Sequence, residues 1–191
     1  MSTSHHTTNR TPKLRFGSFN DQWMISSFGD SFEQKNIENN QNILTISAQQ
    51  GLISQDKFFT KIVAARDVRN YYLLHKNDFA YNKSYSKGYP MGAIKRLVKD
   101  NKGVVSTLYV CFRSKDVRSI EFYEQYFAAG KLNAEIEKIA QEGARNHGLL
   151  NMSVVDFFNM QIIAPSLNEQ RKIAEFLVAV DEKISLMQQK L

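Results

Sequence analysis

The C-terminal segment that begins at Ser166 carries the most regular hydrophobic pattern in the chain, and it limits the possible folds more than any other feature. Its apolar residues are separated by gaps of 4, 3, 4, 3 and 4, the a/d spacing of a coiled coil: Ile173, Leu177, Val180, Ile184, Met187 and Leu191. Glu169 follows Ser166 at capping-box spacing, which predicts that a helix begins at Ser166. This helix would be roughly 35 Å long at about 1.5 Å per residue. We expect its apolar seam to pack on another helix, although packing against its own domain stays open.

Before this helix, the chain contains stretches with the composition of strands. The segments NILTIS (42–47) and VVSTLYVCFR (104–113) are rich in β-branched and apolar residues. In GAIKRLVKD (92–100), successive side chains would point to alternate faces of a strand, and the segment ends at a turn sequence. We therefore expect it to form a hairpin with residues 104–113. Residues 57–68 fit a strand and a helix equally well.

Helical spacing appears after residue 114, and Gly130 suits the end of a first helix. The apolar residues that define this helix and the next are Val117, Ile120, Tyr123 and Phe127, then Leu132, Ile136 and Ile139. Ser153 is expected to cap a short helix, followed by a strand that ends before Pro165.

These patterns predict an α+β fold, in which a mixed-sheet globular domain is followed by a long C-terminal coiled-coil helix. We expect residues 1–11 to form a disordered tail, residues 12–165 the globular domain, and residues 166–191 the helix.

The positive charge of the chain is concentrated in one segment. The net charge is +6, yet residues 57–102 contain eleven Lys or Arg residues and three acidic residues, a local charge of +8. The remainder of the chain therefore carries −2. Such a segment favours a surface that faces a polyanion, and an ordinary solvated face is the alternative.

Cations, planar rings and amides lie together in several loops of this chain. Lysines neutralise phosphates, whereas amides, hydroxyls and guanidinium groups can reach base edges in a groove. The residues that we expect to face nucleic acid are Gln49, Gln50, Arg66, Arg69, Lys83, Ser84, Tyr85, Ser86, Lys87, Tyr89, Arg145, Asn146 and His147. Gly88 and Gly92 would let the backbone of the central loop approach closely. For the tyrosines, half-buried packing on a sheet is an equally good interpretation.

Signals of catalysis are not apparent in the sequence. It contains no GxxxxGK[ST] phosphate loop, no GxGxxG after a strand, and no histidines or cysteines at metal-ligand spacing, so we expect neither a cofactor nor a metal. The one cysteine, Cys111, lies in an apolar run and is expected to be a buried structural thiol. No apolar run is long enough to span a membrane and the N-terminus lacks a secretory pattern, so the expected compartment is the cytoplasm.

The order of five segments resembles one half of a specificity (S) subunit of type I restriction-modification systems. The segments are PKLRFGSFNDQW (12–23), FGDSFE (28–33), DFAYNKSYSKGYPMGAIKRL (78–97), GVVSTLYVCFR (103–113) and IIAPSLNEQRKIAEFLVAVDEKI (162–184). The last matches the family pattern best, although the family commonly has a second proline before the Glu-Gln pair. A complete subunit has two recognition domains and two helices, whereas this chain has one of each; a truncation and a natural half-subunit are both compatible with that.

The resemblance implies a DNA-recognition role without a catalytic site of its own. Residues 12–165 would be a target-recognition domain that binds double-stranded DNA, and the helix would be a spacer that docks modification (methyltransferase) subunits. Restriction subunits would complete the complex, and a homodimer or a second half-subunit would form through the helix. Within the domain, YNKS would shape its loop, and YSKGYP would be the part that reads sequence.

Three other functions remain open from the sequence. A dimeric nucleic-acid-binding regulator unrelated to restriction would share the basic loops and the helix. A nuclease would need a site assembled from residues that are distant in sequence, and a coiled-coil scaffold would need only the C-terminal helix.

Overall fold

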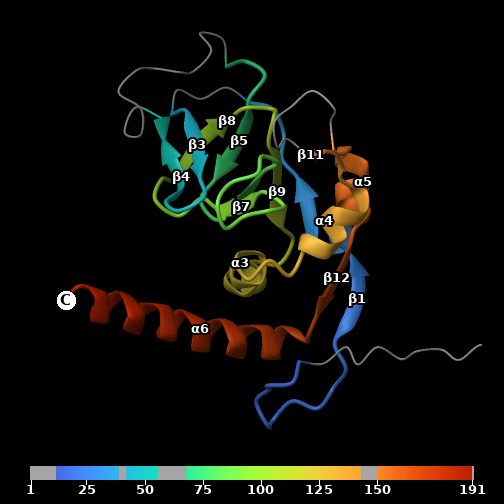
Figure 1. Ribbon diagram of the computed structural model, residues 1–191, viewed down its shortest axis with the longest axis vertical. Coiled ribbons are helices and arrows are strands. Elements are labelled where there is room, and N and C mark those ends of the chain that lie inside the picture. The colour runs from blue at the N-terminus through green and yellow to red at the C-terminus, as the bar shows by residue number, and fades with distance from the viewer. Residues whose placement is uncertain (1–11, 39–41, 56–67, 143–149, 191) are drawn as a thin grey trace, which may run out of the picture.

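A four-stranded antiparallel sheet forms the centre of the protein, in the order β2 (Phe32–Gln34), β9 (Val110–Ser114), β6 (Phe79–Asn82) and β7 (Ala93–Arg96). The computed structural model describes residues 12–38, 42–55, 68–142 and 150–190. Figure 1 shows this sheet between a β-rich lobe and the helices.

Both faces of the sheet are buried, because successive side chains of a strand point in opposite directions. On one face, Phe79 and Tyr81 of β6 meet Phe112 of β9 in an aromatic core that α3 and α5 complete. On the other face, Ala80 and Cys111 join an aliphatic core. Cys111 is 1% exposed, and burial raises the pKa of its thiol, so the expectation of a buried structural thiol is confirmed.

The aliphatic core is enclosed by two further antiparallel pairs. The hairpin of β3 (Leu44–Ser47) and β4 (Gly51–Ser54) confirms the strand expected in NILTIS. The second pair consists of β5 (Tyr72–His75) and β8 (Lys102–Val105). We expected a mixed sheet, but the strands of the described residues all pair antiparallel. Parallel pairing in these residues is confined to the isolated bridge between Ile43 and Val104.

The hairpin expected between residues 92–100 and 104–113 is wrong. β7 pairs with β6, and β8 pairs with β5. The apolar run 104–113 is not one strand but two, because a turn closed by the bond from the Tyr109 N–H to the Ser106 carbonyl separates β8 from β9. The two halves of the run therefore belong to different sheets.

The helices follow the expected spacing closely. After the short helix η1 (Val117–Ser119), the helix α3 (Ile120–Ala128) buries Ile120, Tyr123 and Phe127, and Gly130 takes a positive φ of 67° after its end. Val117, which we expected on the buried face, is 74% exposed because it precedes α3 in η1. The remaining helices of this part are α1 (Phe28–Ser31), α4 (Asn133–Ile139) and α5 (Val154–Asn159), the last capped by Ser153 as expected.

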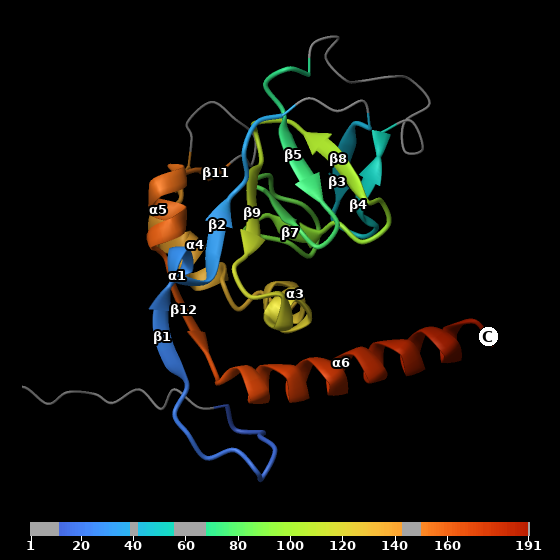
Figure 2. The same ribbon diagram turned by 180° about the vertical axis from the view of Figure 1, so that it is seen from behind.

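The first and the last strand of the described chain pair at one side of the domain (Figure 1). β1 (Met24–Ser27) pairs antiparallel with β12 (Gln161–Ala164), which leads directly into α6 (Leu167–Gln188), and a smaller pair joins β10 (Gln141–Glu142) to β11 (Leu150–Asn151). α6 has 22 residues and packs on η1 and α3. Both views show α6 beneath α3, on the side away from β3, β4, β5 and β8 (Figures 1 and 2).

Candidate nucleic-acid interface

The loop between β6 and β7 is shaped by the side chains at its two ends. Tyr81 is fully buried, and its hydroxyl donates a 2.8 Å hydrogen bond to the Met91 carbonyl at the far end of the loop. Burial raises the pKa of this phenol. The Asn82 Oδ1 accepts a 3.0 Å bond from the Ser84 N–H, which turns the chain away from β6. The YNKS segment therefore fixes the shape of the loop.

A glycine is required where the loop returns to β7. Gly92 has φ of 74°, and a Cβ atom there would lie 2.2 Å from the Asn82 carbonyl oxygen. Gly88 also has a positive φ, of 84°, but no atom lies within 4 Å of the position of its Cβ. Gly92 thus allows two backbone segments to touch, whereas Gly88 serves a turn that faces open space.

The middle of this loop presents both a ring and a cation to solvent. Tyr85 is 64% exposed and Lys87 is exposed, whereas Lys83 is half-buried. Neither lysine makes an ion pair within the described part of the chain. The carbonyl of Lys83 accepts a 3.0 Å bond from the Leu150 N–H, so β11 supports the base of the loop.

The tip of the loop is a closed turn. Ser86 and Tyr89 form an antiparallel bridge, with a 2.8 Å bond from the Tyr89 N–H to the Ser86 carbonyl. Both side chains are half-buried, as is that of Ser84. The Tyr89 hydroxyl accepts a 2.9 Å bond from Lys95 Nζ, so this ring is held by its neighbour.

The other residues expected to face nucleic acid are not gathered at this loop. Gln49 and Gln50 are exposed in the turn between β3 and β4, and Arg69 is exposed in the turn before β5. Within the described ranges, no hydrogen bond joins these turns to the loop at 83–92. Four expected residues lie outside the described residues: Arg66, Arg145, Asn146 and His147.

A buried carboxylate inside the basic segment was not anticipated. Asp78 is 1% exposed, and its oxygens lie 2.8 Å from Arg113 Nε and 3.0 Å from Lys35 Nζ. The His75 N–H also donates to it at 2.7 Å. Since two cations surround one carboxylate, Asp78 does not offset the charge of the lysines around it. Sequence spacing offered no signal, because the partners come from three different segments.

One cation of the basic segment, Arg96, is paired with acidic residues of the domain. Arg96 lies 3.1 Å from the Glu121 carboxylate and 2.7 Å from that of Glu124, both on α3. Burial raises the pKa of Glu124, although Arg96 acts in the opposite direction. Arg96 therefore anchors β7 to α3, and the cations left for a partner are fewer than the local charge of +8 suggests.

The beginning of α6 is anchored by a contact that the sequence did not predict. Ser166 is the N-cap residue, as expected, but its side chain makes no capping bond. The carboxylate of Glu169 instead accepts two 2.6 Å bonds from the Arg15 guanidinium and one of 3.4 Å from Trp23 Nε1. The expected capping box is therefore wrong, since Glu169 is drawn to a cation from the N-terminal segment.

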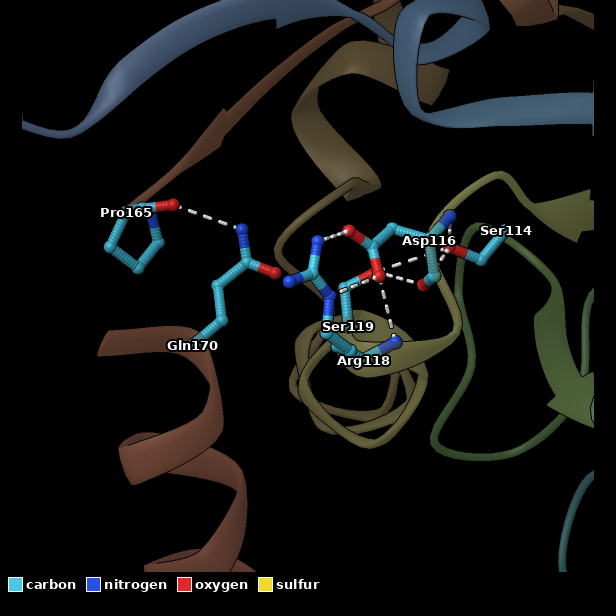
Figure 3. Close-up of polar contacts among 6 residues, drawn as sticks. All are labelled: Ser114, Asp116, Arg118, Ser119, Pro165 and Gln170. Carbon is cyan, nitrogen blue, oxygen red and sulfur yellow. Dashed lines mark hydrogen bonds and ion pairs between the residues drawn. The ribbon is translucent and has the colours of Figure 1, made fainter. Parts of the chain in front are cut away.

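A further contact lies at the junction between β12 and α6, where the Gln170 side chain donates a 2.9 Å bond to the Pro165 carbonyl (Figure 3). In the same view, Asp116 caps η1 of the domain and accepts bonds from both the side chain and the backbone N–H of Arg118. Gln125 of α3 donates a 2.7 Å bond to Asp181 farther along α6. The helix is thus held along the domain over more than its first turn.

The apolar seam of α6 divides into two parts. Ile173 and Leu177 are half-buried and line an apolar pocket against the N-terminal segment, with Pro12, Leu14, Phe16, Trp23 and Phe176. Val180, Ile184 and Met187 are 37%, 48% and 61% exposed. Leu191 lies outside the described residues. The inner part packs on its own domain, the alternative that the sequence left open, whereas the outer part is available to a partner.

The described residues contain neither a metal-binding cluster nor a membrane-spanning helix. Within the described ranges, no group of three His, Cys, Asp or Glu side chains could hold a metal ion. No helix in the same ranges combines the length and hydrophobicity needed to cross a membrane.

Comparison with protein families gives one match that covers most of the chain. The family described as the type I restriction modification DNA specificity domain matches residues 25–191. Comparison with curated proteins gives no match.

Solved structures of low sequence identity share the fold. The HsdS subunit from Thermoanaerobacter tengcongensis superposes with a TM-score of 0.58 at 16% identity, covering 87% of this chain. The type I restriction-modification S subunit from M. genitalium gives 0.55 at 18% identity, covering 94%. A chain from a study of complex assembly and conformational transition of the type I R-M system gives 0.57 at 16%, covering 87%. This protein covers 44% of the length of each of these three chains.

Proposed function

The chain belongs to the family of type I restriction modification DNA specificity domains, and on that premise we propose that it recognises a sequence in double-stranded DNA for a type I restriction-modification complex. The observation that carries the proposal is the family match over residues 25–191. The exposed ring and cation of the loop at 83–92 support it, because they offer base-edge and phosphate contacts on one loop.

We assign the two parts of the chain different tasks. Residues 12–165 would bind the target, and residues 166–191 would set the distance to a second recognition domain and dock partner subunits. The exposed outer seam of α6 supports this division, since apolar residues at a/d spacing suit a second helix. In this proposal the methyltransferase and restriction subunits carry out methylation and cleavage, and the chain itself needs neither cofactor nor catalytic site.

We propose that the lysines and the uncharged side chains contact different parts of the DNA. Lys83 and Lys87 would contact phosphates, because they are cations on a loop with no acidic partner in the described part of the chain. Tyr85, Gln49 and Gln50 would reach base edges, because their side chains are exposed on turns.

The binding test uses the full chain and a duplex of arbitrary sequence. The logarithm of the binding constant should fall with the logarithm of salt concentration, with a slope of about −0.9 for each phosphate contact. Replacing Lys83 and Lys87 by Ala should make the slope less negative by up to about 1.8 and weaken binding to every sequence alike. A control in which Lys131 and Lys183 become Ala removes the same charge from other exposed positions.

Two results would count against the proposal. If the constant for duplex binding by the unmodified chain did not change with salt concentration, phosphate contacts would not drive binding. Failure to co-purify with an adenine methyltransferase subunit, together with intact DNA binding, would favour a regulator outside restriction systems.

A further inference from the structure

Two turns that are distant from the loop at 83–92 form a second basic surface. One turn connects β5 to β6 and contributes Lys76, with His75 at the end of β5 beside it. The other connects β7 to β8 and contributes Lys99, with Lys102 at the start of β8. All four side chains are exposed. We call these four residues the basic turn pair.

Backbone hydrogen bonds hold the two turns together. The Lys76 N–H donates to the Asn101 carbonyl and the Asn77 N–H to the Leu97 carbonyl, both at 2.8 Å. His75 lies opposite Lys102 in the ladder between β5 and β8. These backbone bonds hold the two turns against each other, so the Cα positions of the three lysines are set by the fold.

The three lysines of this surface are not paired by the protein. Lys76, Lys99 and Lys102 make no ion pair with any described residue. Asp78 is buried and contacts Lys35 and Arg113, and it lies 3.9 Å from Nδ1 of His75. Asp100 is the acidic residue within the second turn, and it is half-buried.

The chemistry of the surface suits phosphates better than a protein partner. Protein interfaces are generally depleted in lysine and centred on aromatic or other apolar anchors. The one large apolar side chain exposed in these two turns is Val98, at 46%. A duplex DNA backbone, by contrast, is recognised by lysines without any apolar contact.

We propose that the basic turn pair binds the phosphate backbone of duplex DNA as a second contact surface, separate from the loop at 83–92. The proposal rests on the DNA-binding function proposed above. The loop and the turn pair lie at opposite ends of the β6–β7 hairpin, about 13 Å apart for four residues at roughly 3.3 Å each. At that distance their contributions to binding should add.

The test compares salt dependence of duplex binding for the full chain and for K76Q/K99Q/K102Q. Three lost phosphate contacts should make the slope less negative by up to about 2.7, that is, about 0.9 for each. K76R/K99R/K102R keeps the charge and should keep the slope of the unmodified chain. K131Q/K183Q/K190Q removes the same charge from exposed positions elsewhere and should change the slope much less. The unfolding midpoint of each variant should stay close to that of the unmodified chain, because all the replaced lysines are exposed. A lowered midpoint would identify loss of fold, and the arginine variant separates that from loss of charge.

The outcomes distinguish this inference from the proposed function. An unchanged slope in K76Q/K99Q/K102Q, with normal binding by the unmodified chain, would overturn the inference and leave the proposed function intact. An equal change in K131Q/K183Q/K190Q, or in the arginine variant, would also overturn it, because position or charge would then not matter. If the unmodified chain bound no duplex, both the proposed function and the inference would fail.

Discussion

At the scale of single residues, Gly92 connects the sequence of the loop at 83–92 to its shape. Its φ of 74° disfavours any side chain, and a Cβ atom would meet the Asn82 carbonyl oxygen at 2.2 Å and the Tyr81 ring at 2.8 Å. Gly92→Ala should therefore lower the free energy of unfolding by clearly more than the roughly 1–2 kcal/mol that left-handed backbone alone costs a residue. Urea unfolding followed by circular dichroism measures this loss.

Gly88 supplies the matched control for that substitution. Its φ of 84° is similar, yet no atom lies within 4 Å of the position of its Cβ. Gly88→Ala should cost only the backbone contribution, about 1–2 kcal/mol. Equal losses in the two variants would contradict the claim that close approach to Asn82 is what requires glycine at position 92.

The pair of Asp116 and Arg118 makes a prediction about acid stability. Side-chain and backbone hydrogen bonds from Arg118 lower the pKa of Asp116 from 3.8 to about 2 (Figure 3). Because the unfolded chain takes up this proton at higher pH, the contribution to stability is complete above pH 3.8 and is lost as the pH falls toward about 2. Urea unfolding between pH 2 and pH 5 should show a weaker pH dependence in Asp116→Asn than in the unmodified chain, and identical slopes would exclude this role.

At the scale of secondary-structure elements, Glu169 determines how α6 joins the domain. It is 1% exposed and binds both Arg15 and Trp23, so Glu169→Ala should release the N-terminal segment from the helix. Trp23 is the one tryptophan of the chain, and its fluorescence reports on this contact directly. We expect a red-shifted emission and stronger quenching by iodide in the variant.

Glu175→Ala is the control for that experiment, because Glu175 is exposed on the same helix. Its emission and quenching should match those of the unmodified chain. A Glu169→Ala variant with unchanged fluorescence would show that other contacts, such as that between Phe16 and Phe176, hold the segment on their own.

The same contact explains what local sequence could and could not predict about α6. The start at Ser166 could be predicted, because a serine followed by apolar periodicity is a local signal. The partner of Glu169 could not, because Arg15 lies 154 residues earlier. A bidentate, charge-assisted bond to arginine is stronger than a bond to one backbone N–H, so the distant partner prevails over the local cap.

The incorrect hairpin has a similar physical origin. The pattern of residues 104–113 predicted extended structure, which both halves have, but it contains no information on the turn between them or on which strand each half pairs with. β7 pairs with β6 because the loop closed by Tyr81 and Gly92 brings them together, and β8 is left to pair with β5. Strand type is a local property, whereas pairing depends on segments brought together only in the fold.

At the scale of the whole molecule, the composition of residues 57–102 indicated a basic region but not the surface that its side chains form. Tyr85 and Lys87 are exposed, although for the tyrosines the sequence left half-buried packing equally open. The charge count included Arg96, which is paired with acidic residues of α3, and it gave no sign of the cluster at Asp78. Which cations face solvent depends on acidic partners from other elements, so net charge can point to a region but not to the contacting side chains.

Self-association is the last property that belongs to the whole molecule. Ile173, at the inner end of the seam, packs against the core of its own domain, whereas the outer residues Val180, Ile184 and Met187 are exposed and can meet a second helix. If the chain pairs through α6, V180K/I184K/M187K should convert a dimer to a monomer in sedimentation analysis, because charges in an apolar seam oppose pairing. The unfolding midpoint should stay close to that of the unmodified chain, since these side chains are exposed. Ile173→Lys should instead lower the midpoint whatever the oligomeric state, because that side chain packs against the aromatic core. A chain that is monomeric at every concentration before substitution would exclude pairing of two copies through this helix.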